Sequence, residues 1–208
     1  MAGFLFGFDS VLISGVNLPI KHLWDLSDWF HGAFIISISL WGTVAGALVG
    51  GYPTDRLGRK RTLILVGILF TISALGTALA TSPYVFSFFR FIGGLAAGMG
   101  SIAAPAYISE VSLAKHRGKL GMLFQLNLVT GILMAFLSNY ALDGVGGNGN
   151  DWRWMMGIML IPSLIFTLLL LGIVESPRWC ILKNKNVYES IQTLKTIISK
   201  VEVDEFMT

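Results

Sequence analysis

The sequence predicts an all-α membrane protein, a bundle of six transmembrane helices followed by a polar tail. Of its 208 residues, 54% are hydrophobic and only 13% are charged, which leaves more apolar surface than a soluble domain can bury. The apolar residues fall into six segments, each close to the roughly 20 residues that cross a bilayer. Most basic residues lie between these segments. We therefore divide the chain into a transmembrane bundle over 1–174 and a cytoplasmic tail over 175–208.

The predicted spans are apolar runs that end at polar or helix-breaking residues. They cover 1–20, 32–52, 62–80, 84–108, 120–142 and 154–174. Thr81, Ser82 and Pro83 end the third run. A stretch rich in Gly and Asn over 143–151 separates the last two runs and is not expected to be helical.

The tail contains one further predicted element. Asn186, followed three residues later by Glu189, has the spacing of a helix-capping pair. Apolar residues then recur at helical spacing at Val187, Ile191, Leu194 and Ile198. We expect the start of an intracellular helical segment here, a short amphipathic helix against the cytoplasmic face. An ordinary surface helix or a frayed end is the alternative.

The charges between the spans predict the orientation. The segment over 51–61 carries Arg56, Arg59, Lys60 and Arg61, the next basic segment carries Lys115, Arg117 and Lys119, and the tail carries Arg178, Lys183, Lys185, Lys195 and Lys200. The other side has only Lys21 and Arg153. Basic loops stay in the cytoplasm, so we expect both termini on that side. We expect the bundle to lie in the plasma (inner) membrane and the segment over 51–61 to form a short turn.

Because the basic residues form no single patch, the sequence argues against nucleic-acid binding.

Glycines repeat at every fourth position in two of the spans. Gly42, Gly46 and Gly50 follow this spacing in the second span, and Gly94 and Gly98 follow it in the fourth. Small residues allow two helices in lipid to approach closely. We therefore interpret both rows as helix-packing seams.

Asp9 and Arg90 are the two charges predicted to lie well within the hydrocarbon. Each costs about 3 kcal/mol or more there unless it is paired or hydrated. Asp9 is about 16 Å and Arg90 about 10 Å from the outer ends of their spans at the helical rise, a gap that the arginine side chain can close. They also lie in the first helix of each half, as two inverted three-helix repeats would place them. We favour an acid whose protonation is coupled to the arginine contact over a fixed structural ion pair.

Two further sets of polar residues are candidate sites. Gln125, near the start of the fifth span, has an amide that suits a sugar hydroxyl or, equally, a helix–helix hydrogen bond. His22, Asp25, Asp28 and His31 are metal-ligand types at a spacing of three, but we interpret them as a solvated outer loop. We expect no metal, no cofactor and no enzymatic activity, since no catalytic motif is present.

Six short motifs follow one another along the chain and resemble those of one known family. They are Gly7-Phe8-Asp9 with Ile13-Ser14-Gly15; the glycine and D-R-x-G-R-K of Gly51 to Arg61; Arg90-Phe91-Ile92-Gly93-Gly94; Pro105-Ala106-Tyr107-Ile108-Ser109-Glu110 with Arg117-Gly118; Gln125 with Gly131; and Glu175-Ser176-Pro177-Arg178-Trp179. In this order they resemble the sugar porters of the major facilitator superfamily. The resemblance implies the N-terminal half of a twelve-helix fold.

The resemblance also implies roles at the matching positions. Asp9 is similar to the acid that takes up the coupling proton in proton-linked members, with Arg90 as its partner. Gln125 resembles a ligand of sugar hydroxyls and Phe6 an aromatic residue that lines the site. A cytoplasmic gate network is implied for Asp55, Arg56, Arg59, Glu110, Arg117, Glu175 and Arg178. The expected substrate is a monosaccharide or polyol, moved by proton symport, with facilitated diffusion as an alternative.

The chain also departs from the family pattern. Val174 replaces the usual proline, Cys180 a common leucine, and Ile132 a second glutamine of some proton-linked members. Above all, it has six spans where the resemblance implies twelve. We expect a fragment, because Met1 falls where an internal methionine-containing helix could have been cut. Pairing with a second six-span chain or with itself, or a non-transporting membrane remnant or interaction protein, are the alternatives.

Overall fold

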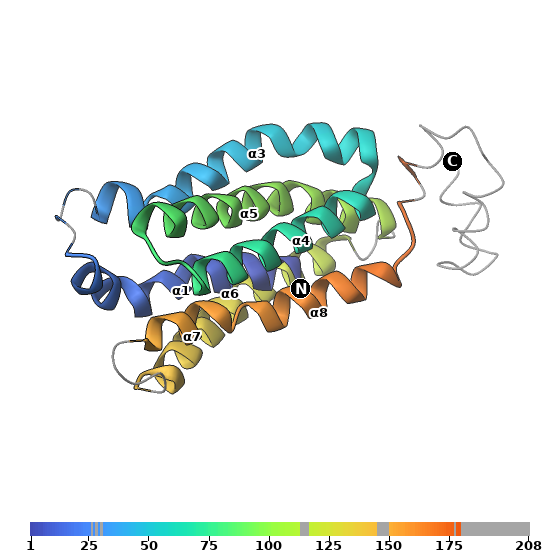
Figure 1. Cartoon of the computed structure of the whole chain (residues 1–208). Coiled ribbons are helices and arrows are strands. Elements are labelled where there is room, and N and C mark those ends of the chain that lie inside the picture. Colours follow the sequence, from blue (N-terminus) through green and yellow to red (C-terminus); the bar gives the residue numbers. More distant parts are fainter. Residues whose placement is uncertain are drawn as a thin grey trace.

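The computed structural model describes residues 1–25, 27, 29, 31–112, 117–144, 150–176 and 178–179, and of Arg117 the backbone only. The described residues form helices that run side by side in one bundle (Figure 1). Their bounds are α1 Ala2–Leu23, the π-helix η1 His31–Ile36, α3 Ile38–Leu57, α4 Arg59–Ala78, α5 Pro83–Val111, α6 Arg117–Leu142, α7 Asp151–Gly157 and α8 Leu160–Leu171.

Six helical segments are long and apolar enough to cross a membrane, as the sequence predicts. The second combines η1 with α3, and the sixth combines α7 with α8. The predicted tail helix over 187–198 lies outside the described residues.

The predicted turn over 51–61 is wrong. Helix α3 continues through Pro53 to Leu57, and α4 begins at Arg59, so the connection is Gly58 alone. Gly58 has φ +100°, a conformation that glycine adopts without steric cost. Pro53 has no backbone N–H, so it removes one hydrogen bond of the helix. The hydroxyl of the adjacent Thr54 donates to the carbonyl of Gly50, with an oxygen–oxygen distance of 2.6 Å. Helix α5 likewise runs past the predicted end at 108 and includes Glu110.

The glycine rows are packing seams, as predicted. Helix α3 packs on α5, α1 on α6, and α4 on both α5 and α8. A Cβ added at Gly94 would lie 2.1 Å from the carbonyl oxygen of Ser39, and one at Gly98 would lie 2.1 Å from that of Thr43. These backbones therefore approach so closely that only glycine fits.

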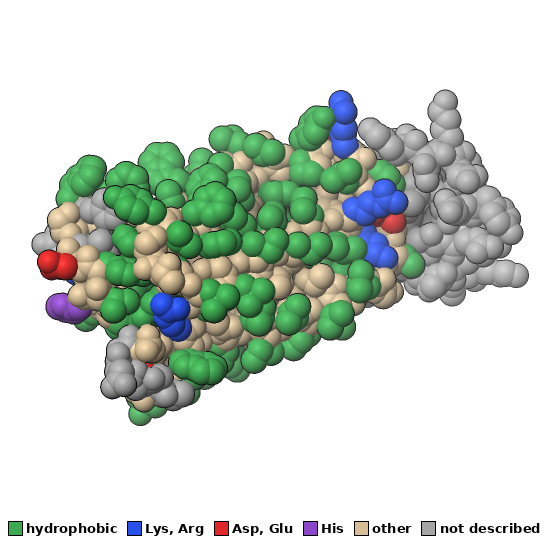
Figure 2. Space-filling view, in the orientation of Figure 1, with side chains coloured by type: hydrophobic (Ala, Val, Ile, Leu, Met, Phe, Trp, Pro, Cys, Tyr) green, Lys and Arg blue, Asp and Glu red, His purple; other side chains and the backbone are tan. Residues whose placement is uncertain are grey.

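The six spans are buried to very different extents. In the most apolar part of α5, 56% of residues are buried inside the bundle, compared with 22% in η1–α3 and 11% in α6. Figure 2 shows hydrophobic side chains along the length of the bundle, with basic side chains gathered at the end where α3 meets α4. Much of α3 and α6 is therefore free to contact lipid or other protein.

Candidate functional site

Asp9 and Arg90 form an ion pair inside the bundle. Nη1 of Arg90 donates to Oδ1 of Asp9 at 2.7 Å, and each residue is only 2% exposed. Helix α1 places Asp9 within its first half, and α5 places Arg90 two turns from its start. The structure thus brings together the two charges that the sequence singles out.

The surroundings of this ion pair are small and polar. The hydroxyl of Ser39, on α3, donates to Oδ2 of Asp9 at 3.5 Å. Ser73 on α4 donates to the carbonyl of Phe89, and its Oγ would lie 2.5 Å from a Cβ added at Gly93. Among the described residues, Nε of Arg90 has no hydrogen-bond partner although it is buried. The site therefore draws on four helices, α1, α3, α4 and α5.

The two predicted sugar contacts lie on α1 and α6, with Phe6 three positions before Asp9. Gln125 is exposed on α6, and no described residue hydrogen-bonds its side chain. Phe6 is half-buried on α1 and packs against the core. Ser10 and Ser14 of α1 are also exposed. Helices α1 and α6, which pack on each other, thus carry exposed polar groups at membrane depth.

Part of the predicted charge network is assembled around Arg59, at the end of the bundle where α3 meets α4. The guanidinium of Arg59 contacts Glu110 Oε1 through Nε at 3.1 Å and Nη2 at 2.9 Å. Nη2 also lies 3.3 Å from the carboxylate of Asp55. The other oxygen of Glu110 accepts from the hydroxyl of Ser176 at 2.5 Å. We call Asp55, Arg59, Glu110 and Ser176 the Arg59 cluster.

Glu175 lies next to this cluster and holds the start of α4. Its Oε1 accepts the backbone N–H of Lys60 at 2.8 Å and that of Ser176 at 3.0 Å. A carboxylate at a helix N-terminus satisfies an unpaired donor and faces the positive end of the helix dipole. Its Oε2 would lie 2.5 Å from a Cβ at Gly58, so the glycine also makes room for it.

Among the described side chains, Arg56 and Arg178 form no ion pair with the cluster. Arg56 stacks on the ring of Tyr52, 4.7 Å from its centroid. Arg178 is exposed, and the side chain of Arg117 is outside the described part of the structure. Ser176 and Trp179 belong to the last sequence motif, but no role in the network was predicted for them. The indole N–H of Trp179 donates to the carbonyl of Asp55 at 2.9 Å. Both side chains are uncharged, so charge patterning could not assign them to the network.

The outer residues considered as metal ligands form no such site in the described residues. No group of three or more His, Cys, Asp or Glu side chains there could hold a metal ion, and Asp28 is not among the described residues. Nε2 of His31 instead pairs with Oδ1 of Asn17 on α1.

Six apolar spans around a buried ion pair define an integral membrane protein with a polar centre. The profile of the family described as "Sugar (and other) transporter" matches residues 1–207. The chain belongs to this family.

Individual relatives agree with this assignment. The chain is 38% identical over 190 residues to a glucose transport protein of Synechocystis sp., covering 87% of this chain and 40% of the relative. It is 39% identical over 183 residues to the arabinose-proton symporter of Bacillus subtilis, covering 86% of this chain and 39% of the relative.

A solved structure shows the same fold. The E. coli proton:xylose symporter XylE, a major facilitator superfamily protein bound to 6-bromo-6-deoxy-D-glucose, matches with a TM-score of 0.90 and 29% identity, covering 99% of this chain and 50% of XylE. The chain therefore has half of the major facilitator fold, and it spans about half the length of the relatives it matches or less.

Proposed function

We propose that this chain forms one half of a transporter that moves a monosaccharide or polyol by alternating access, coupled to a proton. The Asp9–Arg90 ion pair carries this proposal, because it is a charged pair buried at membrane depth beside the exposed polar groups of α1. Relatives named as an arabinose-proton symporter and a proton:xylose symporter support both the substrate class and the coupling.

In the proposed mechanism, Asp9 takes up the coupling proton when its contact with Arg90 breaks. A carboxylate separated from its counter-charge in a dehydrated site is costly as an ion and becomes neutral by binding a proton. Ser39 and the unpartnered Nε of Arg90 provide polar groups near both side chains. Breaking and restoring one ion pair thus links proton binding to helix movement between α1 and α5.

The proposed substrate site lies on the exposed polar face of α1 and α6. Gln125 would bind sugar hydroxyls through its amide, which both donates and accepts, and Phe6 would pack against the sugar ring. An exposed amide on a membrane-spanning helix is costly in lipid, which favours a protein-lined, hydrated cavity at this face. The other wall would come from a second six-helix half, within a longer chain or from a separate six-span chain.

The Arg59 cluster, together with Glu175, Arg56, Arg117 and Arg178, is proposed as the gate at the cytoplasmic face of the plasma membrane, with both termini on that side. The excess of basic residues at this end of the bundle supports the orientation. Interfacial ion pairs of modest strength can bias a two-state equilibrium between outward- and inward-facing forms.

The decisive experiment measures transport by proteoliposomes that contain this chain assembled with its second half. With Asp9→Asn we expect proton-driven accumulation of sugar to be lost while exchange of sugar down its gradient remains. Gln125→Ala should instead raise KM for the sugar in both assays. Full accumulation by Asp9→Asn would rule out proton coupling at this residue and leave a fixed structural ion pair.

A further inference from the structure

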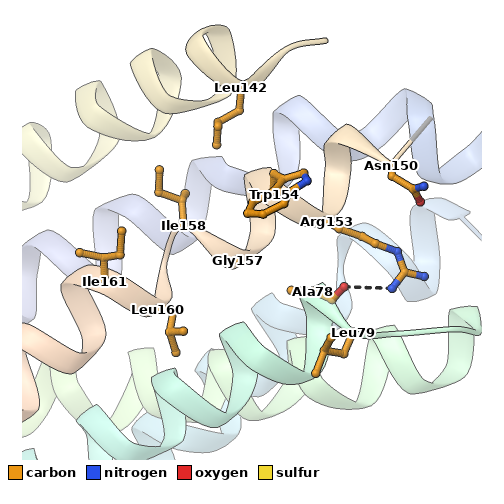
Figure 3. Close-up of a pocket in the computed structure, with 10 residues that line it drawn as sticks. All are labelled: Ala78, Leu79, Leu142, Asn150, Arg153, Trp154, Gly157, Ile158, Leu160 and Ile161. Atoms are coloured by element: carbon orange, nitrogen blue, oxygen red, sulfur yellow. Dashed lines mark hydrogen bonds between the residues drawn. The ribbon is translucent and has the colours of Figure 1, made fainter. Parts of the chain in front are cut away.

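A cavity opens at the end of the bundle opposite the Arg59 cluster. It has a volume of about 770 Å³ and lies between α6, α7, α8 and the end of α4 (Figure 3). Its lining is apolar except for Asn150 and Arg153. Because α4 begins at Arg59, and its last residue Ala78 and the following Leu79 line this cavity, one whole span separates the two sites.

The polarity of the cavity changes along the membrane normal. Figure 3 shows Arg153 and Asn150 on one side and Ile158, Leu160 and Ile161 on the other. Arg153 and Ile161 are eight positions apart, or about 12 Å along a helix. The polar side therefore lies toward the helix ends and the apolar side toward the middle of the bilayer.

Exposed aromatic side chains place the polar side at the membrane interface. Trp154 is 61% exposed, Tyr84 is 73% exposed and Tyr140 is 85% exposed. All three lie near the ends of their helices on the same side of the bundle as Arg153. Trp and Tyr gather at the level of the lipid headgroups, so Arg153 lies at that level too.

The guanidinium of Arg153 is held in place by backbone carbonyls, without a matching negative charge among the described residues. Its Nη1 donates to the carbonyl of Ala78 at 3.3 Å and its Nη2 to that of Ala80 at 3.0 Å. It also stacks over Trp152, 4.7 Å from the ring centroid. No described carboxylate forms an ion pair with it, and Asp151 beside it accepts the N–H of Gly144 instead. Since guanidinium has five N–H donors, three remain beyond the two carbonyl contacts.

We propose that this cavity binds an anionic glycerophospholipid from the surrounding bilayer. One acyl chain fills the apolar part, and the phosphate contacts Arg153 and the amide of Asn150. Arginine matches the geometry of phosphate, and the volume lies in the range of about 300–1,000 Å³ typical of ligand pockets. The charge at the mouth favours a net anionic headgroup over a zwitterionic one. This site is independent of the proposed sugar transport.

The test uses the full chain, purified in detergent and stripped of lipid, with native mass spectrometry during titration by phosphatidylglycerol or phosphatidylcholine of the same acyl chains. The wild-type chain should retain one phosphatidylglycerol about tenfold or more tightly than phosphatidylcholine, as expected for hydrogen bonds to a charged group. Arg153→Gln should remove this preference. Lys21→Gln, which deletes a charge predicted to lie on the same side of the membrane, should leave it unchanged.

Two variants fill the cavity and leave Arg153 in place. A Cβ added at Gly157 would lie 3.6 Å from the Cβ of Ala78, an ordinary van der Waals contact. Because Gly157 lines the cavity, the rest of the leucine side chain in Gly157→Leu should fill it and lower phosphatidylglycerol binding about tenfold. Ile161→Trp, at an exposed lining position, provides a second blocking variant. Undiminished binding in folded forms of both variants would overturn the proposal. So would an equal affinity for both lipids, or a dimer of the chain that Gly157→Leu abolishes.

Discussion

At the scale of single residues, Asp9 and Arg90 are the part of the site that the sequence predicts best. They are opposite charges within long apolar runs, where the cost of an unpaired charge leaves few alternatives to pairing. Ser39 was not predicted as a neighbour of Asp9, because a serine on a glycine-lined helix has no distinguishing pattern. The position of a hydroxyl depends on the rotation of α3 against α1, which only the packed structure defines.

The ion pair predicts strongly unequal effects of single and double substitutions. Arg90→Gln leaves a buried carboxylate without its partner, and we expect the free energy of unfolding to fall by about 3–5 kcal/mol. Adding Asp9→Asn should recover much of this loss, because no uncompensated charge is then buried. Unfolding of the purified chain by denaturant in detergent would measure both values.

Arg61→Gln, at an exposed position on α4, provides the matched control and should change stability little. Additive losses in the Asp9 and Arg90 double-mutant cycle would contradict a direct interaction.

At the scale of elements, the connection between α3 and α4 shows how a distant residue can complete a turn. One glycine joins two helices of 20 residues each. The backbone N–H of Lys60, at the start of α4, donates to the carboxylate of Glu175, which lies 115 positions further along the chain. Two positions of the D-R-x-G-R-K motif thus have a structural explanation. Gly58 leaves room for the Glu175 carboxylate, and the N–H of Lys60 at the start of α4 binds that carboxylate.

This connection predicts different outcomes for two neighbouring glycines. In Gly58→Ala the new Cβ would meet the Glu175 carboxylate at 2.5 Å, and φ of +100° disfavours any side chain. We expect a loss of about 1–3 kcal/mol in stability. Thermal unfolding of the purified chain, followed by circular dichroism, would measure it.

Gly51→Ala is the control for this prediction. A Cβ at Gly51, inside α3, meets no atom within 4 Å. Alanine favours a helix over glycine by up to about 1 kcal/mol, so this variant should be neutral or slightly stabilised. Equal destabilisation of both variants would show that the steric argument at Gly58 is wrong.

The sequence predicts the number and type of the elements better than their ends. Apolar runs of bilayer length identify all six spans, but α3 and α5 continue past them. Hydropathy detects where a helix leaves the hydrocarbon, whereas the helix itself ends where its backbone hydrogen bonds do. The charges of Asp55 and Arg56 between two apolar runs suggested a turn, yet both residues lie in the last turn of α3.

At the scale of the whole molecule, the Arg59 cluster links α4, α5 and the segment after α8. Glu110 contributes to it from the end of α5, Arg59 from the start of α4, and Ser176 from beyond α8. Asp55 is 73% exposed on its side chain, so its share of the stability is small. The contact between Arg59 and Glu110, with side chains 14% and 9% exposed, is the principal one.

Removing this contact should loosen one end of the bundle and leave the other unchanged. In Arg59→Gln we expect amide hydrogen exchange at Lys60 and Ser176 to speed up about tenfold to a hundredfold, as for the loss of a charged hydrogen bond. Exchange at the α7 end should not change. Hydrogen exchange followed by mass spectrometry resolves the two ends.

Arg56→Gln is the matched control, since Arg56 stacks on Tyr52 outside the cluster. Its exchange rates should equal those of the unmodified chain. Faster exchange in this control would indicate that the charge of the whole segment, and not the Arg59 contact, stabilises this end.

The Glu175 contact also sets an order of events during synthesis. A ribosome adds about 5–20 residues per second, so the 115 positions between Lys60 and Glu175 take roughly 6–23 seconds to make. For most of that interval α4 is complete, since it ends at Ala78, but the backbone N–H of Lys60 lacks its carboxylate. The joint between the second and third spans is therefore completed only after the sixth span has emerged, which ties the maturation of the early helices to the translation of the last one.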